Sequence, residues 1–215
     1  MDTLEPAAPD GAVVLFDGSN ADAWQSTKDS GPYRWKVEEG ALHIVPKTGD
    51  IVSRQPFEDH YLHLEFRGPD MPEATGQKKG NSGVYLQGRY EVQVLDSSGW
   101  NVPGKGDCGA VYDQFAPLTN ACKPAMEWQA YDIFFRSPRF DDAGTRTEGP
   151  RLTVLLNGVC IQNNVELPGV TGGAMDEKVA EPGPLRLQDH GDLVSYRNIW
   201  VVPLSKHGSD TYKPH

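Results

Sequence analysis

Hydrophobic and polar residues alternate along much of the chain with a period of two. The stretch 61–67 is the clearest case, since Leu62, Leu64 and Phe66 fall on one side and the polar residues between them fall on the other. This period is typical of β-strands that bury one face. The pattern therefore predicts strands, and we find no convincing amphipathic helix between them.

Further short stretches have the composition or the alternation of strands, with turn-forming residues between them. They are 12–16, 34–38, 41–45, 51–54, 82–87, 89–95, 109–113, 128–136, 151–156, 159–163, 184–189 and 194–202. Two of them flank Asn157-Gly158, a pair that readily takes the positive φ of a two-residue hairpin. About a dozen short strands without helices predict an all-β fold of antiparallel sheets, closed as a sandwich or a barrel.

The chain has 215 residues, which is the length of one large domain. No linker or shift in composition interrupts it, so we expect a single domain over 12–204, with tails at 1–11 and 205–215. Three turn-rich stretches are long for loops of a compact β domain, and we expect them to shape a binding edge. They are 68–80, 97–107 and 165–183.

Composition narrows the choice of partners. The chain has 20 basic and 30 acidic residues, a net charge of -10, which argues against nucleic acids and anionic membrane surfaces. The longest apolar run is 12–16, whereas a membrane helix needs about 20 residues. The 23 glycines and 17 prolines favour many turns over a helical bundle. No secretory signal is visible, so either the chain is cytoplasmic or a signal was removed before residue 1.

Four of the predicted strands place polar side chains of mixed chemistry on one face. These are His63, Glu65 and Arg67; Glu91 and Gln93, followed by Asp96; Arg186 and Gln188, followed by His190; and Ser195 with Arg197. If the strands are neighbours, one face carries carboxylate, amide, imidazole and guanidinium groups, which suits a neutral ligand rich in hydroxyls. A merely solvated face is the alternative. The absence of lysine from all four strands favours a ligand site.

The chain lacks the motifs of several common enzyme classes. It contains no G-x-S-x-G turn, no P-loop, no H-E-x-x-H and no glycine run of a dinucleotide-binding fold. It also lacks a C-x-x-C pair, which argues against a zinc ribbon.

Several segments taken together resemble the 3-keto-disaccharide hydrolase family. They are 15–18, 81–85, 90–96, 109–112, 127–132, 156–158, 187–191 and 196–199. The resemblance runs from about Val14 to Leu204. It implies a jelly-roll sandwich similar to concanavalin A-like lectins and glucanases, with carbohydrate on the concave face, in agreement with the alternation. It also implies cleavage of glycosides whose sugar a separate dehydrogenase has first oxidised at C3.

Such a reaction suggests roles for the polar residues. A 3-keto group acidifies the C2 proton, so a base can remove it, the C1 group departs by elimination, and water adds back. This chemistry needs a base, a stabiliser of the enolate and an acid at the glycosidic oxygen. We expect His190 or Glu91 as the base, Arg197 as the stabiliser and Glu65 as the acid. The expected substrate-binding residues are Asn81, Tyr85, Gln93, Asp96, Gln188 and Trp100, the last as a plate for sugar stacking.

Other interpretations stay open at this point. His190 could simply form a turn, Glu91 and Arg197 could form a structural ion pair, and Trp100 could anchor its loop. No cofactor is required by the sequence, although a divalent metal held by histidine and carboxylates could replace Arg197. The rival function is a non-catalytic carbohydrate-binding module on the same scaffold. An ordinary glucanase fits less well, because Gln93 stands where a second acid would be needed.

The resemblance also bears on location. Many members of the family are secreted or periplasmic bacterial proteins, and a disulfide between Cys108 and Cys122 would fit such a compartment. A bridge closing this loop would add about 3 kcal/mol of stability in the chain-entropy model. The sequence sets no oligomeric state.

Overall fold

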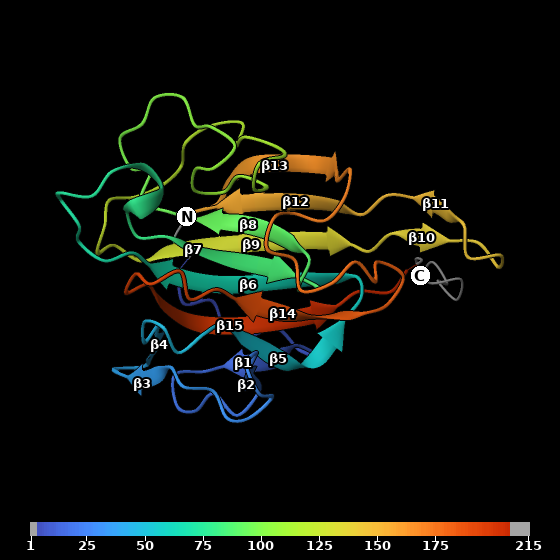
Figure 1. Ribbon diagram of the computed structural model, residues 1–215, viewed down its shortest axis with the longest axis horizontal. Coiled ribbons are helices and arrows are strands. Elements are labelled where there is room, and N and C mark those ends of the chain that lie inside the picture. Colours follow the sequence, from blue (N-terminus) through green and yellow to red (C-terminus); the bar gives the residue numbers. More distant parts are fainter. Residues whose placement is uncertain (1–3, 207–215) are drawn as a thin grey trace, which may run out of the picture.

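The computed structural model describes residues 4–206, and these form two antiparallel β-sheets that share one hydrophobic core (Figure 1). The larger sheet has the order β13 (Val159–Glu166), β12 (Arg151–Leu156), β9 (Gln129–Arg136), β6 (His60–Arg67), β15 (Ser195–Pro203), β4 (Ala41–His43) and β3 (Lys36–Glu38), with β1 (Val13–Phe16) also paired to β15. The smaller sheet has the order β2 (Trp24–Ser26), β5 (Ile51–Phe57), β14 (Gly183–Leu187), β7 (Ser82–Leu86) and β8 (Tyr90–Val94).

The remaining elements are short. A hairpin of β10 (Arg139–Phe140) and β11 (Arg146–Glu148) extends beyond one end of the sheets, and the long segment 95–128 lies at the other end (Figure 1). Within residues 4–206 the helical structure is one 3₁₀ turn, η1 (Gly76–Lys78). The described chain contains no helix with the length and apolar character needed to cross a membrane. The predicted all-β sandwich of antiparallel sheets is therefore confirmed.

The core consists of alternate side chains from both sheets. Leu62, Leu64 and Phe66 of β6 are buried in it together with Val84 of β7 and Val92 of β8. Each such side chain contributes about 1.5–3 kcal/mol relative to its exposed state. Because neighbours in a strand point to opposite faces, the residues between these positions lie on the two outer faces of the sandwich.

Turn residues explain one correct prediction and one error. Asn157 and Gly158 have φ values of 54° and 79°, and they join β12 to β13 as the predicted two-residue hairpin. The predicted strand 109–113 is wrong, because positive φ at Gly109 and Asp113 interrupts extended backbone. Within that stretch only Val111 makes isolated bridges. The short strands β2, β10 and β11 were not predicted.

Part of the predicted N-terminal tail is in contact with the larger sheet. Glu5 and Pro6 hydrogen-bond to side chains of β6 and β15. Residues 1–3 and 207–215, which include most of the predicted C-terminal tail, lie outside the described residues.

Gly183, at the start of β14, packs closely against the backbone of the turn between β7 and β8. A Cβ at this position would lie 2.3 Å from the carbonyl oxygen of Gln87, a backbone atom that cannot move freely. Gly183→Ala should therefore lower the free energy of unfolding, measured with urea, by about 1–3 kcal/mol. Gly68→Ala is the control, because its Cβ would meet no atom within 4 Å. Equal stability of the two variants would contradict this account.

Candidate functional site

A polar cavity of about 250 Å³ lies on the outer face of the smaller sheet. It is lined by Gln77, Asn81, Tyr85, Glu91, Gln93, Tyr112, Gly172, Gly173, Gln188 and His190. The structure thus brings together both candidate bases and most of the expected substrate-binding residues.

The register of β7 and β8 places the central groups of this cavity. Tyr85 and Glu91 are direct cross-strand partners, and both point away from the core that holds their neighbours Val84 and Val92. Gly83 gives the carboxylate its space, since a Cβ there would lie 2.2 Å from Glu91 Oε1. The sheet therefore holds Glu91 in place through register and through one missing side chain.

Glu91 has the properties of an acid–base group. Its side chain is buried, and Oε2 accepts a hydrogen bond of 2.8 Å from the Tyr85 hydroxyl. Burial raises the pKa of Glu91 to about 7, against the opposing effects of the Tyr85 hydrogen bond and the Arg186 charge. A carboxyl group with this pKa can accept and return a proton at neutral pH.

The guanidinium group of Arg186, on β14, stacks on the ring of Tyr85. Its guanidinium carbon lies 3.6 Å from the centroid of the Tyr85 ring, and Nη1 donates to the Gly173 carbonyl at 2.7 Å. Burial raises the pKa of the Tyr85 hydroxyl, which keeps it protonated as a donor to Glu91. The sequence analysis placed Arg186 on a polar strand face but gave it no role. Its guanidinium nevertheless contacts two residues that line this cavity, Tyr85 and Gly173.

Amide side chains form another part of the wall. Gln93 Nε2 donates to Asn81 Oδ1 at 3.0 Å, and Asn81 Nδ2 donates to the Gln77 carbonyl at 2.8 Å. The buried Oε1 of Gln188 has no hydrogen-bond partner among the described residues. An acceptor in this state suits a ligand hydroxyl. His190 is exposed at the cavity rim.

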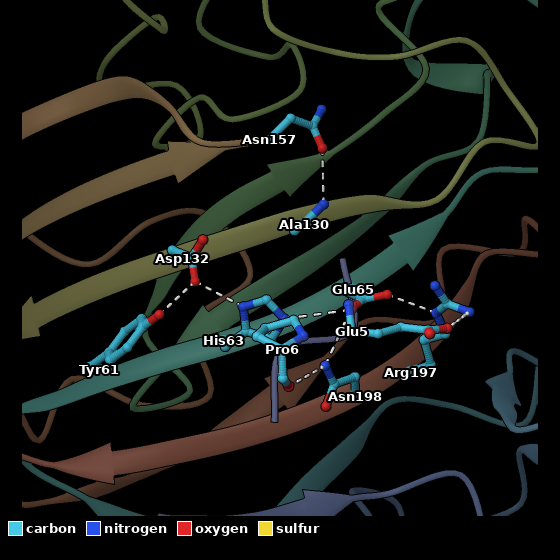
Figure 2. Close-up of polar contacts among 10 residues, drawn as sticks. All are labelled: Glu5, Pro6, Tyr61, His63, Glu65, Ala130, Asp132, Asn157, Arg197 and Asn198. Carbon is cyan, nitrogen blue, oxygen red and sulfur yellow. Dashed lines mark hydrogen bonds and ion pairs between the residues drawn. The ribbon is translucent and has the colours of Figure 1, made fainter. Parts of the chain in front are cut away.

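Glu65 and Arg197 do not reach this cavity, so the predicted single face of polar residues is wrong. They are register partners on β6 and β15 of the larger sheet, joined by an ion pair of 2.7 Å between Arg197 Nε and Glu65 Oε2 (Figure 2). Glu65 alternates with Leu64 and Phe66 of the core, so it lies on the outer face opposite to that of Glu91. Alternation fixes which side of a strand is polar, but not which sheet the strand joins.

A charged network surrounds Glu65 on that outer face (Figure 2). His63 Nδ1 lies 2.8 Å from Asp132 Oδ1, and His63 Nε2 lies 3.6 Å from Glu65 Oε1. Burial alone would lower the pKa of His63, but the neighbouring Asp132 and Glu65 carboxylates raise it. Burial alone would raise the pKa of Glu65, but the nearby His63 ring and hydrogen bonds from the Glu5 amide, Asn198 and Arg197 lower it to about 2. The Glu65 carboxylate is therefore held as an anion by its neighbours.

Two further predicted site residues lie outside the cavity. Asp96 binds Lys79, with 3.0 Å between Oδ2 and Nζ, and so anchors the segment that carries η1. Trp100 packs against the hydrophobic core as a loop anchor, which was the alternative to a sugar plate.

Cys108 and Cys122 carry free thiols in this structure, and they lie close together: burial and the contact with Cys122 raise the pKa of the Cys108 thiol. A disulfide between them stays a prediction. Their sulfurs approach adjacent side chains of β9: Cys108 Sγ lies 3.2 Å from the Tyr131 hydroxyl, and Cys122 Sγ lies 3.6 Å from Gln129 Nε2. Within residues 4–206, no three histidine, cysteine or acidic side chains are arranged to hold a metal ion.

The residues that sequence reasoning missed come mainly from loops. Gln77 lies in the stretch 68–80, and Gly172 and Gly173 lie in 165–183, two of the three stretches expected to shape a binding edge. Tyr112 follows the third stretch. The length of the loops thus indicated where the cavity lies, but not which of their side chains line it.

A larger cavity of about 630 Å³ lies beside the β10–β11 hairpin. Its charged side chains are engaged in ion pairs, Arg136 with Glu148 and Lys206 with Glu58 inside the lining, and Arg139 with Asp59 and Glu181 with Lys178 outside it. It contains none of the groups with acid–base properties described above, so the cavity of Glu91 is the better candidate site.

The chain matches known proteins over nearly its whole length. Residues 11–202 match a family described as 3-keto-alpha-glucoside-1,2-lyase-like domain. A 3-keto-disaccharide hydrolase of Bacteroides thetaiotaomicron is 26% identical over 260 aligned residues, covering 95% of this chain and 82% of that protein. The crystal structure of a candidate glycosyl hydrolase from Parabacteroides distasonis superposes with a TM-score of 0.84 at 40% identity, covering 92% of this chain and 85% of the other.

A more distant likeness concerns the fold. The Crh5 transglycosylase in complex with NAG superposes with a TM-score of 0.55 at 14% identity, over 91% of this chain and 85% of the other. The fold and the matches together define a carbohydrate-active hydrolase. The chain belongs to the family of 3-keto-alpha-glucoside-1,2-lyase-like domains, which confirms the family predicted from the sequence.

We expect the negative charge of Glu65 to stabilise the folded protein. Glu65→Gln leaves His63 and Arg197 without their shared carboxylate, and we expect the free energy of unfolding at pH 7 to fall by about 3 kcal/mol. The folded pKa of Glu65 is depressed, so its contribution is present above the unfolded pKa and is lost as the pH falls through the folded value near 2. The difference from wild type in urea unfolding should therefore shrink between pH 5 and 2. A difference independent of pH would refute the electrostatic origin.

Proposed function

We propose that the chain cleaves 3-keto-glycosides in the cavity that contains Glu91. The observation that carries the proposal is a single buried carboxyl group, with a pKa raised to about 7, in a wall of amide and hydroxyl groups. The names of the family and of its Bacteroides relative support a substrate of this class.

Elimination accounts for the presence of one carboxylate. Glu91 is the only acidic residue among those lining the cavity. An ordinary glycosidase uses two carboxyl groups on either side of the scissile bond. Removal of a C2 proton activated by a 3-keto group needs only one base, so this wall fits elimination better than direct displacement at C1.

In the proposed reaction, ionised Glu91 removes the C2 proton, and the electron pair of the broken C–H bond forms the enolate. The enolate then expels the glycosidic oxygen from C1, which leaves a C1–C2 double bond, and the departing oxygen takes a proton from His190. Water adds its hydroxyl to C1 and gives its remaining proton to His190, while Glu91 returns the abstracted proton to C2, which restores the 3-keto sugar. The net change is the addition of one water across the glycosidic bond, with both side chains back in their starting states.

Other cavity residues have supporting roles in this proposal. The Tyr85 hydroxyl fixes the orientation of Glu91 through its 2.8 Å hydrogen bond. Asn81, Gln93 and Gln188 orient sugar hydroxyls, and the unpaired Oε1 of Gln188 accepts one of them. We assign protonation of the departing oxygen to His190, whose position among the residues lining the cavity supports this role. Arg197 and Glu65 have no role in this reaction, because both lie on the other face of the sandwich.

The direct test is turnover of a 3-keto-disaccharide by the purified protein, with the unoxidised disaccharide as the substrate control. Glu91→Gln should lower kcat by about 10²–10⁴-fold, the usual contribution of a general base. Glu65→Gln is the matched variant and should keep wild-type turnover per folded molecule. Deuterium at C2 should slow the wild-type reaction. Normal turnover by Glu91→Gln would exclude the assignment, and binding of the sugar without turnover would favour a carbohydrate-binding module.

The pH dependence follows from the protonation of Glu91. Only the ionised carboxylate can remove a proton, and the pKa of Glu91 is raised to about 7. We therefore expect kcat/KM for the 3-keto-disaccharide to rise with pH through about 7, and to fall at higher pH, where the acid that protonates the departing oxygen loses its proton. Arg186→Met removes a positive charge that lowers this pKa, so the rise should shift to higher pH. A pH profile that is flat from 5 to 9 would contradict the role of Glu91.

A further inference from the structure

The segment before β1 contacts the outer face of the larger sheet through a set of polar groups (Figure 2). The Glu5 amide donates to the Glu65 carboxylate, and the Glu5 carboxylate pairs with Arg197 Nη1 at 2.7 Å. The Pro6 carbonyl accepts from Asn198 Nδ2 at 3.1 Å. Three side chains of the sheet therefore bind a backbone donor, a backbone acceptor and a carboxylate of one dipeptide.

The contact does not depend on the hydrophobic core. No residue from 4 to 11 belongs to the core, and the Glu5 side chain is 68% exposed. A cavity of about 390 Å³ runs beside the segment, bordered by Glu5, Pro6 and the turns at Asp17 and Gly40. The segment therefore lies over a groove that it does not fill.

The sheet side of the contact is organised by groups of the sheet itself. Arg197 Nε holds Glu65 at 2.7 Å, and His63 faces Glu65 from the other side, fixed in turn by Asp132. Against the effect of burial, these sheet groups and the hydrogen bond from the Glu5 amide together lower the pKa of Glu65 to about 2, so part of the effect comes from the segment. The ion pair between Arg197 and Glu65 lies within the sheet and is independent of the segment. The acceptor and the guanidinium would thus keep their positions if the segment left.

We propose that Glu65, Arg197 and Asn198 form a peptide-binding site whose ligand is an extended segment with an acidic residue followed by a free carbonyl. Residues 4–7 occupy the site in cis, as a detachable ligand. The site lies on the opposite outer face from Glu91 and does not depend on the proposed catalytic function.

The chemistry of the site favours a peptide over an acidic sugar. Glu65 is an acceptor only, and it receives a backbone N–H, while Asn198 donates to a backbone carbonyl. Arg197 then selects a carboxylate on the same residue that supplies the N–H. A uronic acid supplies the carboxylate but not the paired amide and carbonyl.

The first measurement uses the full chain with Glu5→Lys, which places a cation beside Arg197. Glu73→Lys is the matched control, because Glu73 is exposed on the loop 68–80 and the change in charge is the same. Amide hydrogen exchange at residue 5, followed by NMR, should be about tenfold faster in Glu5→Lys than in wild type or in Glu73→Lys, because the amide loses its acceptor more often. Unchanged exchange at residue 5 would overturn the ion-pair contact as the element that holds the segment.

The second measurement adds a synthetic peptide of residues 1–10 in trans. The Glu5→Lys chain should bind it about tenfold more tightly than wild type or Glu73→Lys, since the segment in cis no longer competes. The same peptide carrying Glu5→Gln should lose this binding. Equal binding to all three chains would reveal only general charge attraction and would overturn the site. Binding of glucuronate in place of the peptide would likewise overturn it in favour of an acidic-sugar site.

Discussion

The two sheets are held together by apolar side chains that each strand contributes at every second position. Leu64 of β6 and Val92 of β8 belong to the same buried cluster, although they come from different sheets. This packing forces the intervening polar groups outward, in opposite directions for the two sheets. The molecule therefore has two separate polar faces, and each face has its own chemistry.

These two faces treat their buried carboxylates in opposite ways. Glu91 has one hydrogen-bond donor, the Tyr85 hydroxyl, and burial dominates its pKa. Glu65 receives hydrogen bonds from several neighbours, which outweigh burial. The first arrangement gives the Glu91 carboxyl group a pKa near neutral pH, which suits acid–base chemistry. The second keeps the Glu65 carboxylate ionised. Similar residues in similar strands thus serve different purposes because of the donors around them.

Much of the fold could be predicted from the sequence because alternation and turn chemistry are local. Leu62, Leu64 and Phe66 revealed their strand, and Asn157-Gly158 revealed its hairpin. The partner strands of Glu65 are set by pairing between distant segments, and so is the joining of β14 to the β7–β8 hairpin that carries Glu91; no local pattern encodes either. For that reason Glu65 and Arg197 were assigned to the same face as Glu91, and an ion pair was considered between Glu91 and Arg197, whereas Arg197 pairs with Glu65. The loop residues Gln77 and Tyr112 depend on loop conformation, for which the sequence offered only the length of the loops.

Gly83 links the shape of the sheet to the proton affinity of the cavity. Any side chain at this position would intrude on Glu91 Oε1, and its Cβ would also lie 3.0 Å from Cε2 of the Tyr85 ring. Substitution would displace the carboxylate from its present position, and a displacement that exposes it to water would lower its pKa, because burial is what raises it. Engineers who wish to retune this enzyme toward acidic conditions could begin with position 83 and leave the carboxylate itself untouched.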